Sequence, residues 1–372
     1  MRTSVLTDQR PHSDSVTDPG PGVTDDTDDG RVEWTTSSRP SAARRSMGIV
    51  LLAAAVGLAV LLSLAVGAKS MPWSTVVDAV MSYDSTNTDH LIVRELRLPR
   101  TVLGLLVGAA LGAAGALMQG VTRNPLADPG LLGVNAGAAF AVVLAIWGFG
   151  ITSVSGMVWF AFVGAGIASV AVYVLGSAGR GNATPVRLAL AGAALAALLF
   201  ALTRAVTLLD QATLDQFRFW AVGSLGGRGT DVAGQVVVFI AIGLVLAIGV
   251  ARHLNALALG EETATALGTK IAATRTVSVI AITLLCGSAV AAAGPIGFVG
   301  LVVPHAVRAW FGPDQRWLLP ASALAGAAFL LYCDTLGRVL ARPGEVQVGI
   351  MTAAIGGPVF IVLVRRTRMA QL

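Results

Sequence analysis

Side chains that could carry out covalent chemistry are few in this chain and are not spaced for it. Four histidines occur in 372 residues, and none stands in an H-E-x-x-H or similar spacing that would hold a metal ion. The two cysteines, Cys286 and Cys333, lie in apolar runs and are expected to be packing residues. The only lysines, Lys69 and Lys270, do not follow a glycine, so the sequence contains no phosphate-binding loop. We therefore expect no catalytic site, no cofactor and no nucleic-acid partner for the chain itself.

Arginines gather instead at two places that are far apart in the sequence. Three of them stand just before or at the start of one apolar run and two at the end of another: Arg94, Arg97, Arg100, Arg338 and Arg342. A guanidinium binds carboxylates with a rigid set of donors, so such a cluster fits an acidic partner protein. The alternative is local pairing with acids of the same chain, namely Glu95, Asp334 and Glu345.

Residues 260–268 have the pattern of a short helix that docks on another protein. A glycine stands at each end, and two glutamates would occupy the first turn, where negative charge is favourable. Thr263, Ala264 and Leu267 would share one face that is small enough to enter a groove. An ordinary amphipathic loop on a membrane surface is the alternative.

The composition of the chain indicates that membrane-spanning helices position these arginines and the short helix. The chain is 55% hydrophobic and 13% charged, with a mean hydropathy of +0.74, which a water-soluble globule would not tolerate. We expect an all-α polytopic membrane protein. Ten apolar runs are long enough to cross or enter a bilayer, near residues 48–67, 99–120, 131–149, 155–176, 187–209, 232–251, 273–292, 296–311, 317–336 and 347–364.

Charge at the loops predicts the orientation of these spans. Arg39, Arg44 and Arg45 precede the first span, and cationic flanks stay on the cytoplasmic side. An even number of spans then places both termini in the cytoplasm. Lysine and arginine are more numerous on the predicted inner loops than on the outer ones, which agrees with a multi-pass protein of the cytoplasmic membrane.

The residues before the first span have a different character. Residues 1–46 are rich in Asp, Ser, Thr, Pro and Gly and cannot bury enough apolar surface to order themselves. We expect a disordered tail over 1–46, without the apolar core of a signal peptide, and a ten-span domain over 47–372.

The second span has features of a helix packed inside a bundle. Gly104, Gly108 and Gly112 recur every fourth residue and fall on one face, where a neighbouring helix can approach closely. The span ends in a rigid turn at Asn124-Pro125, because proline fixes one dihedral and asparagine can bond its own backbone.

Residues 217–227 are too short and broken to cross a membrane and are expected to form an interfacial helix. For Trp220 within it, anchoring at the lipid interface and contact with a substrate remain equally open. The apolar run is also interrupted at Gly294, Pro295 and Gly297, so the helix boundaries there are the least defined.

Five stretches in this order resemble the FecCD-type permeases, the transmembrane subunits of ABC importers for ferric siderophores, haem and cobalamin. They are R-L-P-R (97–100), N-P-L-A-D-P-G-L-L-G-V (124–134), G-P-I-G-F-V-G-L-V-V-P-H (294–305), D-T-L-G-R (334–338) and V-G-I-M-T-A-A-I-G-G-P-V-F (348–360). The resemblance covers residues 48–366. It implies the ten-span fold of the cobalamin permease, with two inverted halves, to which the similar G-A-A-G and A-A-A-G segments at 112–115 and 291–294 faintly correspond.

The resemblance also implies roles for individual residues. Arg97, Arg100 and Arg338 would meet glutamates of an extracytoplasmic substrate-binding protein. Asn124 and Leu126 would form part of a cytoplasmic gate, completed by the loop around Thr184, although Pro185 replaces an expected small hydroxyl residue. The outer pathway would include Trp220 and Gly223. The segment that couples to the ATPase would comprise Gly260, Glu261, Ala264, Leu267 and Gly268.

The resemblance thus implies a permease that moves a ferric siderophore and performs no enzymatic step itself. ATP and magnesium would be bound by partner ATPase subunits, and a second permease copy or a paralogue would complete the pathway within membrane lipid. Cobalamin or haem are alternative cargoes. An ion-coupled secondary transporter is the rival class, but it would need an ionisable group near mid-membrane, and no Asp, Glu or Lys lies there.

Overall fold

Helices account for the regular structure of this protein, because a backbone within hydrocarbon must satisfy its own hydrogen bonds. The computed structural model describes residues 41–67, 69–177 and 185–369, and no β-strand occurs in these ranges. Seven of the described helices are long and apolar enough to cross a bilayer, and three shorter apolar helices accompany them. The ten coincide with the ten predicted runs, so the prediction of an all-helical polytopic membrane protein with about ten spans is confirmed.

The bounds of these ten helices lie within seven residues of the sequence prediction, and α9 extends furthest beyond it. The long helices are α1 Ala42–Ala65, α4 Leu98–Thr122, α6 Val154–Ser177, α7 Pro185–Leu209, α9 Thr230–Ala258, α11 Ile271–Ala293 and α13 Gln315–Leu340. The remaining three are α5 Val134–Phe149, α12 Val299–Phe311 and α14 Val348–Met369.

Short helices occupy the connections between spans. They are α2 Trp73–Met81, α3 Thr88–Leu91, the π-helical turn η1 Ile92–Arg97, the 3₁₀ turn η2 Pro129–Leu132, α8 Gln211–Ala221 and α10 Glu261–Ala266. The wide turn η1 leads directly into α4, whose second residue is a proline without a donor N–H. The interfacial helix predicted over 217–227 was placed too late in the sequence, because α8 already begins at Gln211 and ends at Ala221, and residues 222–229 form a bend.

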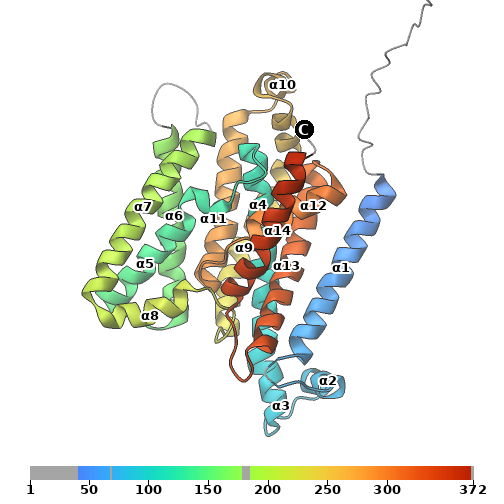
Figure 1. Cartoon of the computed structure of the whole chain (residues 1–372), viewed down its shortest axis with the longest axis vertical. Helices are drawn as coiled ribbons and strands as arrows, with labels where there is room; N and C mark the ends of the chain where they lie inside the picture. The colour runs from blue at the N-terminus through green and yellow to red at the C-terminus, as the bar shows by residue number, and fades with distance from the viewer. Residues whose placement is uncertain (1–40, 68, 178–184, 370–372) are drawn as a thin grey trace, which may run out of the picture. The chain divides into compact units, whose positions relative to one another are not determined.

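The short helices separate to the two ends of the helix bundle (Figure 1). The start of α1, the helix α10 and the end of α14 lie at one end, which we call the inner end. The helices α2, α3 and α8 lie at the opposite, outer end. Because the first span starts and the last span ends at the same end of the bundle, the number of crossings is even, as the prediction of ten spans requires.

The glycine face of the second span is a contact between α4 and α13. A Cβ on Gly108 would lie 2.5 Å from the carbonyl oxygen of Gly326, and one on Gly112 would lie 2.1 Å from that of Ser322. Both distances are too short for any side chain. The two backbones therefore touch along this face, as the four-residue spacing predicts.

The interruption between the seventh and eighth spans is a partly buried, non-helical connection. α11 ends at Ala293, and the chain turns through Gly294 and Phe298, both with positive φ, before α12 begins. The connection contacts the bend after α8, since Ser224 N–H donates to the carbonyl of Ala293 at 2.7 Å. The irregular backbone thus gains a protein partner for its hydrogen bonding at the end of α11.

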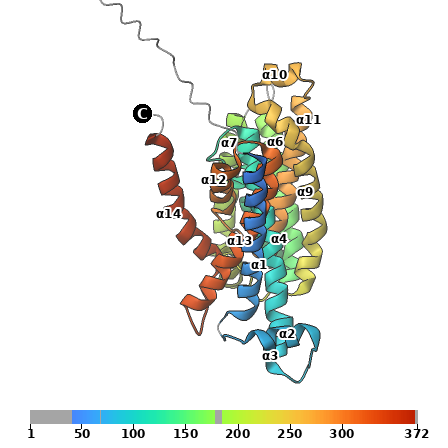
Figure 2. The same cartoon turned by 90° about the vertical axis from the view of Figure 1, so that its right-hand side faces the viewer.

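Apolar side chains are exposed over much of the bundle, as expected where lipid or another subunit covers it. Figure 2 shows that α14 leans away from the other helices toward its C-terminal end. Its exposed residues include Ile350, Val359 and Ile361.

Residues 1–40 lie outside the described ranges. The helix α1 begins at Ala42, where the Ser41 hydroxyl accepts a hydrogen bond from Arg44 N–H at 3.3 Å. The predicted division into 1–46 and 47–372, and the two inverted halves, stay predictions.

Candidate functional site

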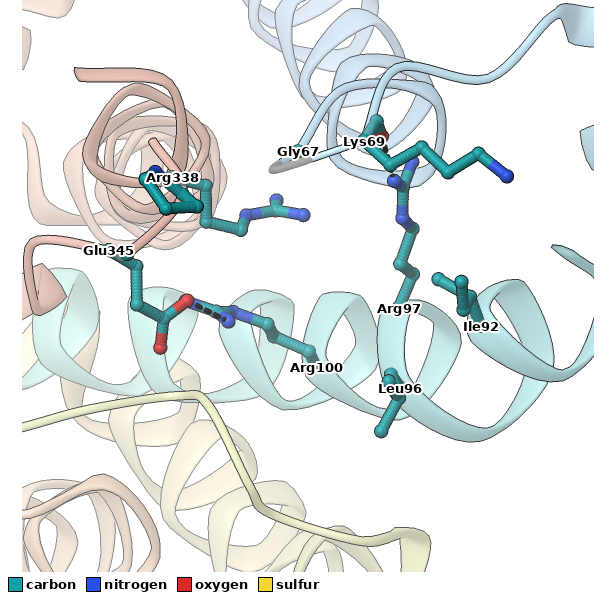
Figure 3. Close-up of a pocket in the computed structure, with 10 residues that line it drawn as sticks. Gly67, Lys69, Ile92, Leu96, Arg97, Arg100, Arg338 and Glu345 are labelled. Carbon is teal, nitrogen blue, oxygen red and sulfur yellow. Dashed lines mark hydrogen bonds and ion pairs between the residues drawn. The ribbon is translucent and has the colours of Figure 1, made fainter. Parts of the chain in front are cut away.

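Three arginines meet at the outer end because α4 and α13 lie side by side and the residues after α1 pass close to them. Arg97 precedes α4, Arg100 lies in its first turn, and Arg338 lies in the last turn of α13. Figure 3 shows Arg97 turned toward Gly67 and Lys69, and Arg100 turned toward Glu345. We call these three residues with Asp334 and Glu345 the outer arginine cluster.

Asp334 is the centre of this cluster. Arg100 grips it with two donors, at 3.0 Å from Nε to Oδ2 and 2.7 Å from Nη2 to Oδ1. Arg338 Nη2 lies 3.2 Å from the other side of the same carboxylate, and Asp334 is fully buried. Arg100 also donates to Glu345 Oε2 at 2.7 Å. Bidentate pairing of this kind fixes both side chains in position.

Backbone carbonyls and hydroxyls accept further guanidinium N–H groups of the cluster, whereas Arg338 Nε has no partner within the described residues. Arg97 donates to the carbonyl of Leu64 at 2.6 Å and to that of Lys69. Arg338 donates to the carbonyl and the hydroxyl of Ser63, both at 3.0 Å. These bonds tie the end of α1 to α4 and α13.

The alternative of local pairing is therefore realised for Arg100 and Arg338, with Asp334 and Glu345 as the acids. Arg97 and Arg338 are each only 5% exposed, so their guanidinium groups do not project from the surface. A cavity of about 370 Å³ nevertheless opens beside them and is lined by Lys69, the three arginines and Glu345. We call it the outer arginine pocket.

The short segment at the inner end is a helix, as predicted. Gly260 and Gly268 both have positive φ and bracket α10, and Glu261 lies 2.6 Å from Arg275 of α11. The prediction that Ala264 faces a partner is wrong, because Ala264 is 0% exposed and packs into the core beside α9. Leu267 is 64% exposed and is the apolar residue of this segment that another protein can reach.

The turn after α4 has the predicted local structure. Asn124 Oδ1 accepts a hydrogen bond from Leu126 N–H at 2.9 Å, and Leu126 is exposed. Arg123 adopts the left-handed conformation that ends α4. Thr184, the other gate residue predicted, lies outside the described residues.

Trp220 is not a lipid anchor in this structure. Its side chain is 4% exposed and stacks on Phe217 at a centroid distance of 5.9 Å. Gly223, which follows α8, has a φ of 76°, and a Cβ there would lie 2.4 Å from the carbonyl oxygen of Pro295. Its own carbonyl accepts from Gly349 N–H at 3.1 Å, so this glycine joins α8 to the α11–α12 connection and to α14.

Arg228 is a functional candidate that the sequence argument missed. It lies in the bend before α9 and lines a cavity of about 560 Å³ at the outer end, together with Met157, Phe219, Trp220, Ser224 and Gln347. We call this cavity the Arg228 pocket. Its lining comes from segments that are widely separated in the sequence, so no local sequence motif predicts the cavity.

A sequence model of the FecCD transport family matches residues 54–366. The chain belongs to this family. The resemblance stated from the sequence motifs is thereby confirmed, and this FecCD permease is the transmembrane component of an ABC importer rather than its ATPase.

Individual relatives match over most of their own length. The ferric enterobactin transport system permease protein FepD of Escherichia coli (strain K12) is 51% identical over 309 residues, which are 83% of this chain and 92% of that protein. The probable siderophore transport system permease protein YfiZ of Bacillus subtilis (strain 168) is 42% identical over 83% of this chain and 92% of its own. The hemin transport system permease protein HmuU of Yersinia pestis is 40% identical over 84% and 94%.

The fold of this FecCD permease is also that of a solved relative. An inward-facing metal-chelate type ABC transporter has a TM-score of 0.76 and 30% identity, covering 86% of this chain and 98% of the solved chain. The protein is therefore a multi-pass permease of the cytoplasmic membrane, and its class implies an ATPase and a binding protein as partners.

Proposed function

We propose that this permease imports a ferric siderophore, driven by partner ATPase subunits and supplied by an extracytoplasmic binding protein. The 51% identity to a ferric enterobactin permease over 92% of that protein carries the proposal. Relatives named for hemin and for cobalamin, each 40% identical, make haem and cobalamin the alternative cargoes.

The binding protein docks at the outer arginine pocket. Lys69, Arg97, Arg100 and Arg338 line this cavity against a single acid, Glu345, so its lining carries excess positive charge. An acidic side chain of the binding protein can enter the pocket and meet guanidinium groups that are already held in position. Preformed partners lower the cost of ordering the contact.

Lys69 offers a test of docking, because its side chain is largely exposed and pairs with Asp89 rather than with the buried cluster. Lys69→Glu is expected to weaken capture of the binding protein by roughly tenfold in a pull-down. Arg218→Glu is the matched control, since Arg218 is also exposed at the outer end but does not line this pocket. Equal capture by wild type and Lys69→Glu would contradict docking at the pocket.

Coupling to the ATPase proceeds through α10 at the inner end. Leu267 presents an exposed apolar side chain there, and the ion pair between Glu261 and Arg275 fixes the segment on α11. The gate residues Asn124 and Leu126 lie in the turn that ends α4. A second permease copy or a paralogue packs against the exposed apolar surface within membrane lipid, and both termini face the cytoplasm.

Leu267→Asp is expected to leave the fold intact, because it changes an exposed position. It should lower transport-linked ATP hydrolysis of the assembled importer by about tenfold, since an aspartate cannot replace an apolar contact in a groove. Leu259→Asp is the control, because Leu259 is equally exposed and precedes α10. Normal stimulated hydrolysis in Leu267→Asp would exclude this contact.

Uptake into proteoliposomes tests the function as a whole. The permease is reconstituted with its ATPase subunits and its binding protein, and uptake of a ferric siderophore is measured with and without ATP. We expect uptake only with ATP. Uptake driven by an ion gradient alone would replace the proposal by the ion-coupled class.

A further inference from the structure

The Arg228 pocket contains polar atoms that the protein itself does not satisfy. Arg228 Nη1, Trp220 Nε1 and Gln347 Oε1 are buried and have no hydrogen-bond partner within the described residues. Arg228 is 8% exposed and Trp220 is 4% exposed, so both side chains lie largely within the protein. Unpaired buried groups are rare in folded proteins because each one costs free energy. Their meeting in one cavity indicates a missing ligand.

Arg228 is the one cationic side chain among the residues that line the pocket. Burial lowers the pKa of Arg228 to about 10, so the guanidinium stays protonated at neutral pH. The one acid of the lining, Glu345, is held by Arg100 at 2.7 Å. The carboxylate thus has its own arginine, and the Arg228 guanidinium forms no ion pair with it in the described residues.

The shape and the donors define the class of ligand. A volume of about 560 Å³ is large enough for a small-molecule ligand rather than for a single ion. The apolar lining from Met157 and Phe219 suits a ligand with aromatic or aliphatic surface. The guanidinium and the indole N–H are donors that bind anionic oxygen atoms strongly.

We propose that the Arg228 pocket is a specificity subsite for negatively charged iron chelates, with Arg228 and Trp220 donating to the ligand's anionic oxygens. The inference rests on the proposed import of ferric siderophores, and it states in addition that the imported chelate is negatively charged. A ferric tris-catecholate is trianionic, whereas a ferric trihydroxamate of similar size is neutral. The pocket distinguishes the two by charge.

The two chelates, labelled with radioactive iron, are the probes for a direct binding experiment on the purified permease in lipid nanodiscs. Arg228→Gln should weaken binding of the tris-catecholate about tenfold and leave binding of the trihydroxamate unchanged, since one charge-assisted hydrogen bond is lost. Arg228→Lys keeps the charge and should lose less, about threefold. Trp220→Phe keeps the ring and removes one donor, for a loss of about threefold as well.

Arg94→Gln is the matched control for the removal of one outer arginine. Arg94 is exposed, stacks on Tyr83 at 4.5 Å and does not line the pocket, so binding of both probes should match wild type.

Three results would overturn the inference. They are absence of saturable tris-catecholate binding to wild type, equal affinity of wild type and Arg228→Gln, and an equal loss for both probes. Weakened capture of the binding protein by Arg228→Gln, with chelate binding unchanged, would assign the guanidinium to a protein partner instead. Uptake by wild-type proteoliposomes is measured in parallel, so a failure of ATP-driven import is distinguishable from a failure of the subsite.

Discussion

The outer end of the molecule holds arginines in two opposite states. In the outer arginine cluster, Arg100 and Arg338 share the buried carboxylate of Asp334, and Arg97 donates to backbone carbonyls. In the Arg228 pocket, the guanidinium is buried to a similar degree, but within the described residues it forms no ion pair and its Nη1 has no hydrogen-bond partner. Burial alone therefore does not reveal what an arginine does. An arginine with carboxylate partners in the chain stabilises the fold, whereas one without such partners can bind a ligand.

The largest effect is expected from removing the acid that the cluster shares. Asp334→Asn leaves Arg100 and Arg338 buried against a neutral amide, and breaking a buried ion pair on one side costs about 3–5 kcal/mol of unfolding free energy. Denaturant unfolding of the detergent-solubilised permease measures the change. An unfolding midpoint equal to that of wild type would show that the cluster is not a structural element.

Arg228→Gln should change stability in the opposite direction. The substitution removes a buried charge whose Nη1 has no partner, so the unfolding free energy of the ligand-free permease should rise by about 1–3 kcal/mol. The same unfolding assay applies. A destabilisation as large as that of Asp334→Asn would erase the distinction between the two sites.

A smaller loss is expected where the cluster has spare partners. Ser63→Ala removes a hydroxyl that accepts from Arg338 at 3.0 Å and lies 2.7 Å from the hydroxyl of Thr101. The Arg338 guanidinium keeps Asp334 and Thr335, so the cost should be about 1 kcal/mol. Thermal unfolding of Ser63→Ala and Asp334→Asn in parallel shows which variant loses more stability. A larger loss of stability for Ser63→Ala would mean that Ser63 of α1, rather than Asp334, is the centre of the cluster.

Glu345→Gln should have the smallest effect on stability, below about 1 kcal/mol, because this carboxylate is partly exposed. Glu345 lines both outer pockets, and its neutralisation should tighten binding of the ferric tris-catecholate by about twofold through reduced repulsion. Weaker binding in the variant would mean that Glu345 itself contacts the ligand.

Most of the fold was predictable from the sequence, because apolar runs of bilayer length have little choice but to form helices. The glycine spacing of α4 also predicted a close contact, although not that α13 is the partner. The bend at 294–298 and the turn at Asn124 were predictable because glycine, proline and asparagine interrupt the apolar runs there.

The sites were less predictable, because they depend on which side of a helix meets the bundle. The face of Ala264 could not be assigned from the six residues of α10, and it is buried against α9 rather than offered to a partner. The sequence allowed the arginines to pair with acids of the same chain. Only the contact of α4 with α13 shows that Asp334 is the acid that Arg100 binds. Arg228 escaped notice because its pocket joins residues as distant as Met157 and Gln347.

A cryo-electron microscopy map of the assembled importer with ferric tris-catecholate bound tests the contrast between the two outer sites most directly. We predict iron-chelate density within hydrogen-bond distance of the Arg228 guanidinium and the Trp220 indole N–H, with the pairs of Asp334 to Arg100 and Arg338 unbroken. Chelate density on the outer arginine cluster, or a carboxylate of another subunit paired with Arg228, would contradict the account.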